Sequence, residues 1–339
     1  MSQEDPTAES RKHDHIALAF KSRVESGELD ARFYYDPALS AHPEEGSLKP
    51  LDFLGKQLRT PMWVSSMTGG TALARKINGN LARACAEFGM GMGLGSCRQL
   101  LNSNEFLPDF DVRNVIGPDL PLYANLGSAQ IEQLLENKSA EKIQELIDKL
   151  QADGLIVHIN PLQEAMQPEG DHFSRPPLEI VEEMISRFSF PVIVKEVGQG
   201  FGPASLRALM KLPLGAIEFG AAGGTNFALL ELLRSNEQHQ NAFAGLARVG
   251  HSASEMLEWT NNIASEPGTS CQTRHLIISG GVSDFLDGYY LTRRSVLPAV
   301  YGQASAFLRH AQGDYESLRT FVRAQVRGLE LSNAFLTPR

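Results

Sequence analysis

The segment from His158 to Asp171, HINPLQEAMQPEGD, places an imidazole, three side-chain amides and three carboxylates directly after the apolar run GLIV. Such groups bind polar ligands and transfer protons. Alternation along a strand puts Ile156, His158 and Asn160 on one face. The crowding favours the wall of an active site over a polar loop that only caps the next helix. The polar side chains in this stretch are His158, Asn160, Gln163, Glu164 and Gln167.

A lysine lies inside a second apolar run, PVIVKEVG, which begins at residue 191. Burying an unpaired ammonium group is costly, so Lys195 needs an anionic partner. The sequence leaves three candidates open: Glu196, another carboxylate or a ligand.

Glycines follow other apolar runs, as pairs in GAAGGTN at 220 and SGG at 279 and singly in GQAS at 302. At such turns the backbone can approach a ligand closely and its amides can hold phosphate. Each of these glycine segments alone also fits a tight turn, but together with Lys195 they indicate a phosphorylated cofactor.

Arg98 offers a planar guanidinium fork for phosphate oxygens. The basic segment RKHDHI, residues 11–16, is by ordinary expectation a solvated charge run.

Composition limits the classes of protein that this chain can belong to. It has 339 residues, 42% of them hydrophobic, and a net charge of -9, which argues against general attraction to nucleic acid or an anionic membrane. No apolar run approaches a membrane span and the first residues do not resemble a signal peptide, so we expect a cytoplasmic protein. Cys85, Cys97 and Cys271 lack metal-ligand spacing and predict three free thiols, with Cys97 a small filler.

The elements that must position these groups are short apolar runs that alternate with segments of helical periodicity. Segments such as 72–88 and 129–151 predict amphipathic helices, and 235–274 predicts a loop, a helix and a polar connection. Eight runs predict strands: PMWVSSM at 61, GMGLGS at 91, PLYANLG at 121, GLIVHIN at 154, PVIVKEVG at 191, AIEFGAAG at 216, HLIISGG at 275 and AVYGQAS at 299.

Eight strand and helix pairs of this kind predict a (β/α)8 TIM barrel over residues 61–339, after a polar N-terminal extension over residues 1–60. A doubly wound sheet is the alternative, but it usually concentrates its glycines in one fingerprint after the first strand. Here the glycines are spread over the ends of many strands, which favours the barrel. His158 and Asn160 then lie at the C-terminal mouth, where barrel enzymes carry their active sites.

Read in order, the motifs RKxDH, MTGGT, LGSxR, NLG, HxNPLQE with QPEGD, KExGxG, GGT and SGG resemble those of the type 2 isopentenyl-diphosphate isomerases, an FMN-dependent family. The resemblance runs from Arg11 to about Leu308. Its most specific part is HINPLQEAMQPEGDHF, whereas the glycine motifs alone also fit other FMN barrels.

The resemblance implies an FMN barrel, assembled as a tetramer or octamer, that interconverts isopentenyl and dimethylallyl diphosphate, with NADPH as reductant. It implies flavin contacts at Met67, Thr68, Ser96, Asn125, Lys195 and Thr225, and a flavin-phosphate site at Gly280, Gly281 and Ala304. It implies substrate contacts at Arg11, Lys12, Ser96, Arg98, His158, Asn160 and Gln163, and a Mg²⁺ ligand at Glu164.

The residue types agree with that chemistry. The reaction moves a proton across an unactivated alkene, and the polar cluster contains no strong acid. The resemblance implies that reduced FMN acts as the acid and base, and Lys195 would then stabilise the reduced ring. A single carboxylate, Glu164, suits Mg²⁺, which takes other ligands from water and substrate phosphate. Gln163 would orient the alkene or relay a proton, while Arg11, Lys12 and Arg98 would hold the diphosphate.

Two departures from the family pattern lie late in the chain. Where the family usually has SGGxR, this sequence has SGGVS, so Ser283 stands in place of an arginine expected near the FMN phosphate. The following helix pattern is replaced by FLDGYYLTRRSVLP.

Two rival functions stay open. An FMN-dependent 2-hydroxy-acid oxidoreductase would need a late histidine base and an arginine clamp, for which His251, His275 and Arg274 are available. A catalytically silent flavin-binding paralogue is the other.

Overall fold

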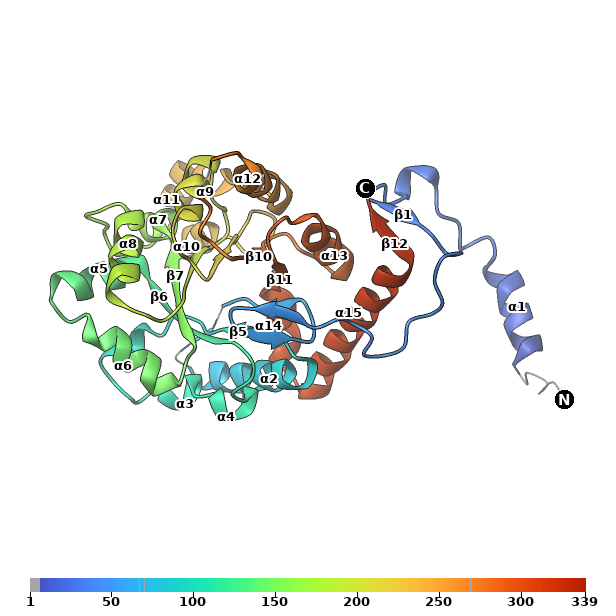
Figure 1. The fold of residues 1–339 in the computed structure, drawn as a ribbon, viewed down its shortest axis with the longest axis horizontal. Helices are drawn as coiled ribbons and strands as arrows, with labels where there is room; N and C mark the ends of the chain where they lie inside the picture. Colours follow the sequence, from blue (N-terminus) through green and yellow to red (C-terminus); the bar gives the residue numbers. More distant parts are fainter. Residues whose placement is uncertain (1–6, 67, 70, 269) are drawn as a thin grey trace.

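The computed structural model of the chain describes residues 7–66, 68–69, 71–268 and 270–339. Eight parallel strands close into a barrel in the order β10-β11-β4-β5-β6-β7-β8-β9, surrounded by helices (Figure 1). The barrel and all eight predicted strands are therefore confirmed. The strands are β4 Met62–Val64, β5 Gly91–Gly93, β6 Leu122–Gly127, β7 Gly154–Ile159, β8 Val192–Glu196, β9 Ala216–Glu218, β10 His275–Ser279 and β11 Ala299–Gln303.

The helices around the barrel follow the strands in turn. They are α2 Ala72–Phe88, η2 Arg98–Leu101, α3 Leu107–Phe110, α4 Arg113–Ile116, α5 Ser128–Glu136, α6 Glu141–Leu150, α7 Pro161–Met166, α8 Pro177–Arg187, α9 Pro203–Met210, α10 Phe227–Arg234, α11 Glu237–Phe243, η3 Leu246–Arg248, α12 Ala253–Ser265, α13 Phe285–Arg294, α14 Ser305–Ala311 and α15 Tyr315–Phe335. Helix α2 has the predicted bounds, because the Thr71 side chain accepts a hydrogen bond from the Ala74 amide and Gly89 ends the helix with a φ of 70°.

Two helix predictions need correction. The segment 129–151 forms two helices, α5 and α6, since the chain turns between them and Lys138 takes a positive φ of 53°. Periodicity continues across this break, which is why the sequence pattern alone does not reveal it. The segment 235–274 contains the expected helix, α12, but also α11 and the short η3 before it.

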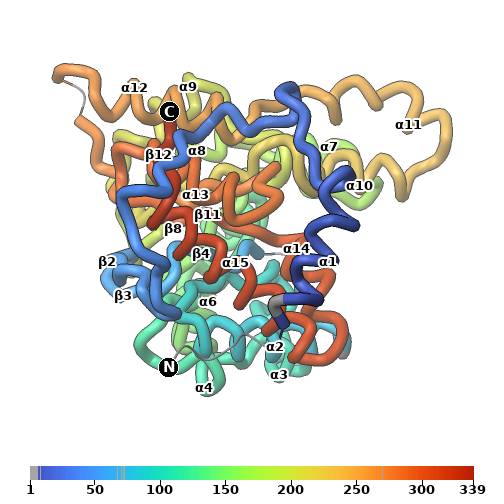
Figure 2. The backbone as a smooth tube through the Cα atoms, turned by 90° about the vertical axis from the view of Figure 1, so that its right-hand side faces the viewer, coloured from blue at the N-terminus to red at the C-terminus, as the bar shows by residue number. Residues whose placement is uncertain are grey.

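In the described part of the chain, six short elements lie outside the barrel and its surrounding helices. They are α1 Ala8–Leu18, η1 Ser26–Glu28, β1 Phe33–Tyr35, β2 Leu51–Phe53, β3 Lys56–Leu58 and β12 Leu336–Pro338. Strand β1 pairs with β12, so the blue N-terminal segment lies beside the red C-terminal end in both views (Figures 1 and 2). The division of the chain at residue 60 stays a prediction.

The β2–β3 hairpin packs where barrel strands begin. Phe53 is fully buried, and its ring lies 6.2 Å from Trp63 of β4 and 4.8 Å from His275 at the start of β10. Leu58 of the same hairpin is also fully buried. Burial of these apolar side chains stabilises the contact. The hairpin therefore packs against the amino-terminal ends of β4 and β10, away from the carboxyl ends where the polar motifs lie.

Two further findings concern the chain's surface and its thiols. Within the described residues, no helix is long and apolar enough to cross a membrane. The three cysteines are free, as predicted. Cys97 is fully buried, and burial raises the pKa of its thiol to about 12. A buried thiol of this kind fills space rather than reacting, in agreement with the sequence expectation.

Candidate active site

Three polar side chains stand in register across neighbouring strands of the barrel. His158 of β7 pairs with Lys195 of β8, and Lys195 pairs in turn with Glu218 of β9. His158 and Lys195 both line a cavity of about 120 Å³ at the strand ends. The position of Lys195 within its apolar run therefore places its ammonium inside the barrel.

The imidazole of His158 is held neutral by its surroundings. Its Nδ1 lies 2.7 Å from Oδ1 of Asn125, an oxygen that can only accept, so Nδ1 carries the proton. Burial, and secondarily the charge of Lys195, lowers the pKa of His158 from 6.5 to about 4. The other ring nitrogen, Nε2, lies close to Gly127, where a Cβ would come within 2.8 Å of it. At neutral pH His158 therefore offers an acceptor nitrogen rather than a positive charge.

The side chains that follow His158 form a cross-bonded network at the start of α7. The Asn160 amide donates to Oε1 of Glu164 at 2.8 Å and to the amide oxygen of Gln163 at 3.2 Å. The second oxygen of Glu164 accepts from the backbone amide of Asp171 at 2.8 Å. Glu164 and Asn160 are buried. The loop from α7 to Asp171 is therefore tied back to the strand that carries His158.

Asp171 extends this network to α5 and to the start of η2. Its carboxylate accepts from the Gln130 amide at 2.7 Å and from the Gln133 amide at 3.0 Å, both on α5. It also forms an ion pair with Arg98 at 3.1 Å. The ion pair uses one guanidinium nitrogen of Arg98, whose side chain remains 58% exposed.

Lys195 finds its anionic partner inside the barrel. Its Nζ lies 3.8 Å from Glu218 and donates to the backbone carbonyl of Glu196 at 2.7 Å. The Glu196 carboxylate instead accepts three backbone amides, from Gly198, Gln199 and Gly200, at 2.6 to 2.7 Å. Of the partners that the sequence left open, the one found is therefore another carboxylate. Glu218 is fully buried, and its second oxygen has no hydrogen-bond partner among the described residues.

A larger cavity of about 360 Å³ adjoins the first one. Both cavities are lined by Ser66, Lys195, Val197 and Phe227. From Lys195 the larger cavity extends to the glycine turns after β9 and β10 and to the start of α14. No described residue that lines it is acidic. In a chain with a net charge of -9, this cavity is suited to an anion.

The turn after β10 is shaped by close backbone packing. Gly280 and Gly281 have positive φ values of 89° and 68°, which favour glycine. A Cβ at Gly280 would lie 2.0 Å from the carbonyl oxygen of Ala221. Gln303 of β11 donates to the carbonyls of Val282 and Ser283, both at 3.1 Å. The turn is thus held by close backbone packing against Ala221 and by the Gln303 side chain.

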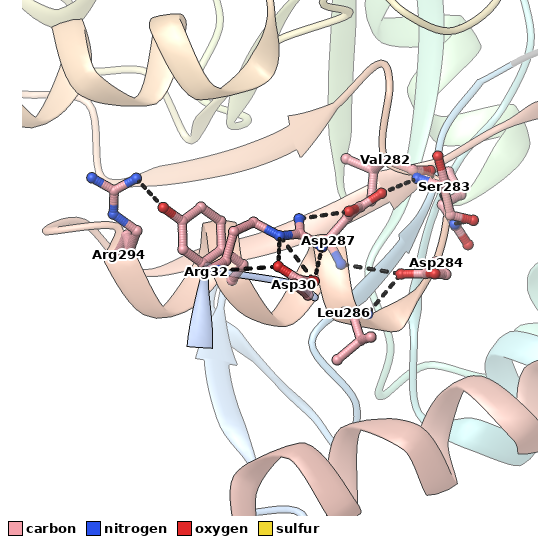
Figure 3. Close-up of polar contacts among 10 residues, drawn as sticks. Asp30, Arg32, Val282, Ser283, Asp284, Leu286, Asp287 and Arg294 are labelled. Atoms are coloured by element: carbon pink, nitrogen blue, oxygen red, sulfur yellow. Dashed lines mark hydrogen bonds and ion pairs between the residues drawn. The ribbon is translucent and has the colours of Figure 1, made fainter. Parts of the chain in front are cut away.

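Contacts from α13 and the N-terminal segment support the same turn (Figure 3). Asp287 accepts from the backbone amide of Ser283 at 2.8 Å and from Arg32 at 2.7 Å. Arg32 is in turn held by Asp30. Asp284 accepts from the amides of Leu286 and Asp287 and so begins α13. Ser283 is therefore part of a fixed loop.

Most of the site residues expected from the sequence gather at the two cavities. The smaller cavity is lined by Ser96, Asn125, His158, Gln163 and Lys195, and the larger one by Lys195, Thr225, Gly280, Gly281 and Ala304. Asn160 and Glu164 contact Gln163 or one another behind this lining. Thr68 lies nearby, where its carbonyl oxygen would be 1.9 Å from a Cβ at Gly95.

Three further expected residues are not among those that line the two cavities. Met67 lies outside the described residues. Arg11 and Lys12 lie on α1, which stands apart from the barrel of the same chain (Figure 1).

The sequence reasoning also missed two residues of the site, Glu218 and Arg309. Glu218 has a signal, because an acid inside the run AIEFG needs a partner as Lys195 does. Arg309 lines the larger cavity, and its spacing of one helical turn from Ser305 was the available signal.

The fold and the site define a (β/α)8-barrel protein with a cationic, glycine-walled cavity at the strand ends. A mandelate oxidase mutant with a monooxide FMN adduct shares this fold, with a TM-score of 0.55 and 14% identity over 91% of this chain and 88% of that one. No protein-family model matches the chain.

Curated relatives identify the family. The isopentenyl-diphosphate delta-isomerase of Rickettsia typhi is 34% identical over 316 residues, which cover 92% of this chain and 88% of that protein. The enzyme of the same name from Rickettsia prowazekii is 34% identical over 305 residues, covering 89% and 85%. The chain belongs to the isopentenyl-diphosphate delta-isomerase family, which confirms the resemblance seen in its motifs.

Proposed function

We propose that this protein interconverts isopentenyl diphosphate and dimethylallyl diphosphate by a proton shift, with reduced FMN in the larger cavity and the substrate in the smaller one. The observation that carries the proposal is that the two cavities meet at Lys195, beside the uncharged wall of His158, Asn125 and Gln163. Membership of the isopentenyl-diphosphate delta-isomerase family supports the substrate pair.

The residues present fit a flavin mononucleotide. The cavity of about 360 Å³ is within the usual range for ligand sites. At one end it has the glycine turn of Gly280 and Gly281, where a Cβ would collide with backbone. At the other end Lys195 faces it, together with Ser66, whose buried hydroxyl has no partner among the described residues. A phosphate at the first end and a polar ring at the second would satisfy these groups.

When bound, reduced FMN would supply the proton donor and acceptor for a reaction without net oxidation or reduction. Lys195 would hold the negative charge of the reduced ring, and Glu218 would fix the position of the Lys195 ammonium. Thr225 would contact the flavin from the same side. Met67, Thr68, Ser96 and Asn125 complete the proposed set of flavin contacts. NADPH is the proposed reductant.

His158 and Gln163 would orient the substrate. Because His158 is neutral near pH 7, it would contact the substrate through Nε2 while Asn125 holds Nδ1. The Gln163 amide would lie along the hydrocarbon part, and Asn160 would fix its orientation. An amide is a weak acid, so the first role of Gln163 is positioning.

Glu164 is the proposed Mg²⁺ ligand. Each of its oxygens accepts one hydrogen bond, so each keeps a lone pair for a cation. No cluster of three or more histidine, cysteine or acidic side chains is arranged for a metal within the described residues. A single carboxylate such as Glu164 suits Mg²⁺, which takes its remaining ligands from water and substrate phosphate.

The diphosphate would bind near Arg98, whose side chain is 58% exposed while one guanidinium nitrogen holds Asp171, so that its other donors could reach phosphate oxygens. Arg11 and Lys12 would join it from α1. Since α1 stands apart from its own barrel, it would do so by moving or from a neighbouring chain in a homo-oligomer, proposed as a tetramer or octamer. We propose a cytoplasmic location for this assembly.

The oxidoreductase alternative receives less support. His275 lies at the start of β10, where its Nδ1 contacts the carbonyl of Gly215 at 3.0 Å. His251 packs against Trp259 and lines an outer groove of about 590 Å³ instead of the Lys195 cavity. Among the described residues, neither histidine is placed to act as a base beside Lys195. The fold shared with mandelate oxidase does not by itself carry function.

The test is anaerobic incubation of the purified protein with isopentenyl diphosphate, FMN, NADPH and Mg²⁺, with each component omitted in turn, followed by proton NMR of the products. The proposal predicts dimethylallyl diphosphate only in the complete mixture. Oxidation of a 2-hydroxy acid without isomerisation would support the oxidoreductase instead. Bound FMN with no conversion would indicate the silent paralogue.

A further inference from the structure

Arg309 of α14 is a positively charged side chain that lines the larger cavity. It lines the cavity together with Gly281, Ser283 and Ser305. Within the described part of the chain, its guanidinium has no hydrogen bond, ion pair or ring contact. Arg319 and Arg327 on the adjacent α15 are both paired, with Glu87 and Glu330. Arg309 therefore differs from its neighbours in having donors available.

The geometry of α14 directs Arg309 toward the glycine turn. Arg309 lies four residues after Ser305, so the two side chains share one face of the helix. Helical side chains incline toward the amino-terminal end of their helix, which here brings the long arginine side chain back over Ala304 and Ser305. Those two residues line the cavity with Gly280 and Gly281.

The charge distribution of the cavity points to the same conclusion. Lys195 and Arg309 are the two lysine or arginine side chains among its described lining residues, and no acid lines it. Lys195 comes from strand β8 and Arg309 from helix α14, which follows β11; strands β9 and β10 lie between β8 and β11 in the barrel. The two nearby acids, Asp284 and Asp287, are engaged with backbone amides of the Ser283 loop and with Arg32 (Figure 3).

We propose that Arg309 binds the flavin phosphate at the glycine turn of Gly280 and Gly281. A guanidinium suits this task because its planar fork donates two hydrogen bonds to phosphate oxygens. Ser283 cannot supply this charge, and its loop is fixed by Gln303 and Asp287. The inference rests on the proposed function, because it requires that the cavity holds FMN.

The test compares FMN with riboflavin, which has the same ring but no phosphate. Dissociation constants for both ligands are measured by flavin fluorescence for the unaltered protein and for Arg309→Met. We expect FMN binding to weaken roughly 10- to 100-fold, as for loss of a charged hydrogen bond, while riboflavin binding stays within about twofold. Added salt should weaken FMN binding less in the variant than in the unaltered protein.

Two further variants complete the experiment. Arg274→Met is the matched control, because Arg274 is an exposed arginine at the opposite end of β10, and it should leave both affinities unchanged. Ser283→Arg placed in the Arg309→Met background should restore FMN affinity, since the loop at 283 lines the same cavity. Circular dichroism establishes that each variant is folded.

The possible outcomes separate the inference from the proposed function. Equal FMN affinity in Arg309→Met and the unaltered protein would overturn the inference and leave the flavin site standing. An equal loss for FMN and riboflavin would also overturn it, because the role of Arg309 would then be general. If the unaltered protein binds neither flavin, the proposed function fails together with the inference.

Discussion

The two walls of the site are built by different means. The wall at the end of β7 consists of side chains that are already hydrogen-bonded, His158 to Asn125 and Asn160 to Glu164. The wall after β10 and β11 consists of glycine backbone, with Arg309 unpaired among the described residues. A cross-bonded wall fixes side chains before a ligand arrives, whereas a glycine wall provides space and amides that an anion completes. We propose that the hydrogen-bonded wall orients the substrate and that the glycine wall holds the cofactor.

Lys195 joins the two walls, so its removal should have the largest effect. In Lys195→Ala we expect a loss of turnover of about 100-fold or more, with binding of reduced FMN weakened more than binding of oxidised FMN. The variant also leaves Glu218 buried without its cation, which should lower the free energy of unfolding by about 3 to 5 kcal/mol. Anaerobic and aerobic flavin titrations measure the affinities, and chemical denaturation measures the stability.

A double variant separates these two effects. Adding Glu218→Gln to Lys195→Ala removes the unpaired charge and should recover much of the stability without recovering the preference for reduced flavin. Equal weakening of both flavin forms would assign Lys195 to general packing and contradict its proposed electrostatic role.

Gly280→Ala should damage the glycine wall alone. The added Cβ would meet the Ala221 carbonyl at 2.0 Å, and the φ of 89° disfavours any other residue. We expect a loss of about 2 to 4 kcal/mol in the free energy of unfolding, with weakened FMN binding. Gly245→Ala is the matched control, since its Cβ meets nothing within 4 Å and its φ is -62°. Similar losses of stability in the two variants would show that position 280 does not require glycine more than position 245 does.

Glu164→Gln should damage the cross-bonded wall alone. The change keeps the shape of the side chain but removes the charge that would hold Mg²⁺, so we expect turnover to fall about 10- to 100-fold and the dependence on Mg²⁺ to weaken. FMN affinity should stay unchanged. Initial rates at several Mg²⁺ concentrations measure the effect. Unchanged turnover would remove Glu164 from the site, and lost FMN binding would break the proposed separation of the two walls.

The smallest expected effect concerns acidity. Because the pKa of His158 is about 4 in the folded protein and 6.5 when unperturbed, the folded state binds fewer protons between these values. Stability should therefore fall as pH drops below about 6.5, by about 1 to 2 kcal/mol at pH 5 from this residue. His158→Gln should remove that part of the pH dependence. Denaturant unfolding at pH 7 and pH 5 measures it, and an identical loss of stability in both proteins would place His158 in a more solvated state.

The sequence predicted the barrel well, for reasons visible in single elements. Runs such as PVIVKEVG are apolar throughout most of their length and end in glycine, as strands buried on both faces do. The break between α5 and α6 was not predictable from periodicity, because the residues on both sides keep the helical pattern while Lys138, between the two helices, takes a positive φ. Local backbone turns of this kind leave a weak sequence signal.

The site was predictable where residue type and strand position coincide. His158 and Lys195 stood out because polar groups in apolar strands need a reason, and the structure brings both to one cavity. Glu218 follows the same rule and was overlooked. The partner of Lys195 could not be chosen from the sequence, because it depends on which strands are neighbours. Arg309 lies on an exposed helix face, where an arginine is ordinary.

The most direct test of the central claim is isomerisation in D2O under anaerobic conditions, with the product analysed by NMR. If the two walls hold the substrate against reduced FMN, deuterium should enter dimethylallyl diphosphate only when the flavin is reduced and Mg²⁺ is present. Dimethylallyl diphosphate formed equally well without flavin, or no deuterated product while reduced FMN is demonstrably bound, would contradict the account.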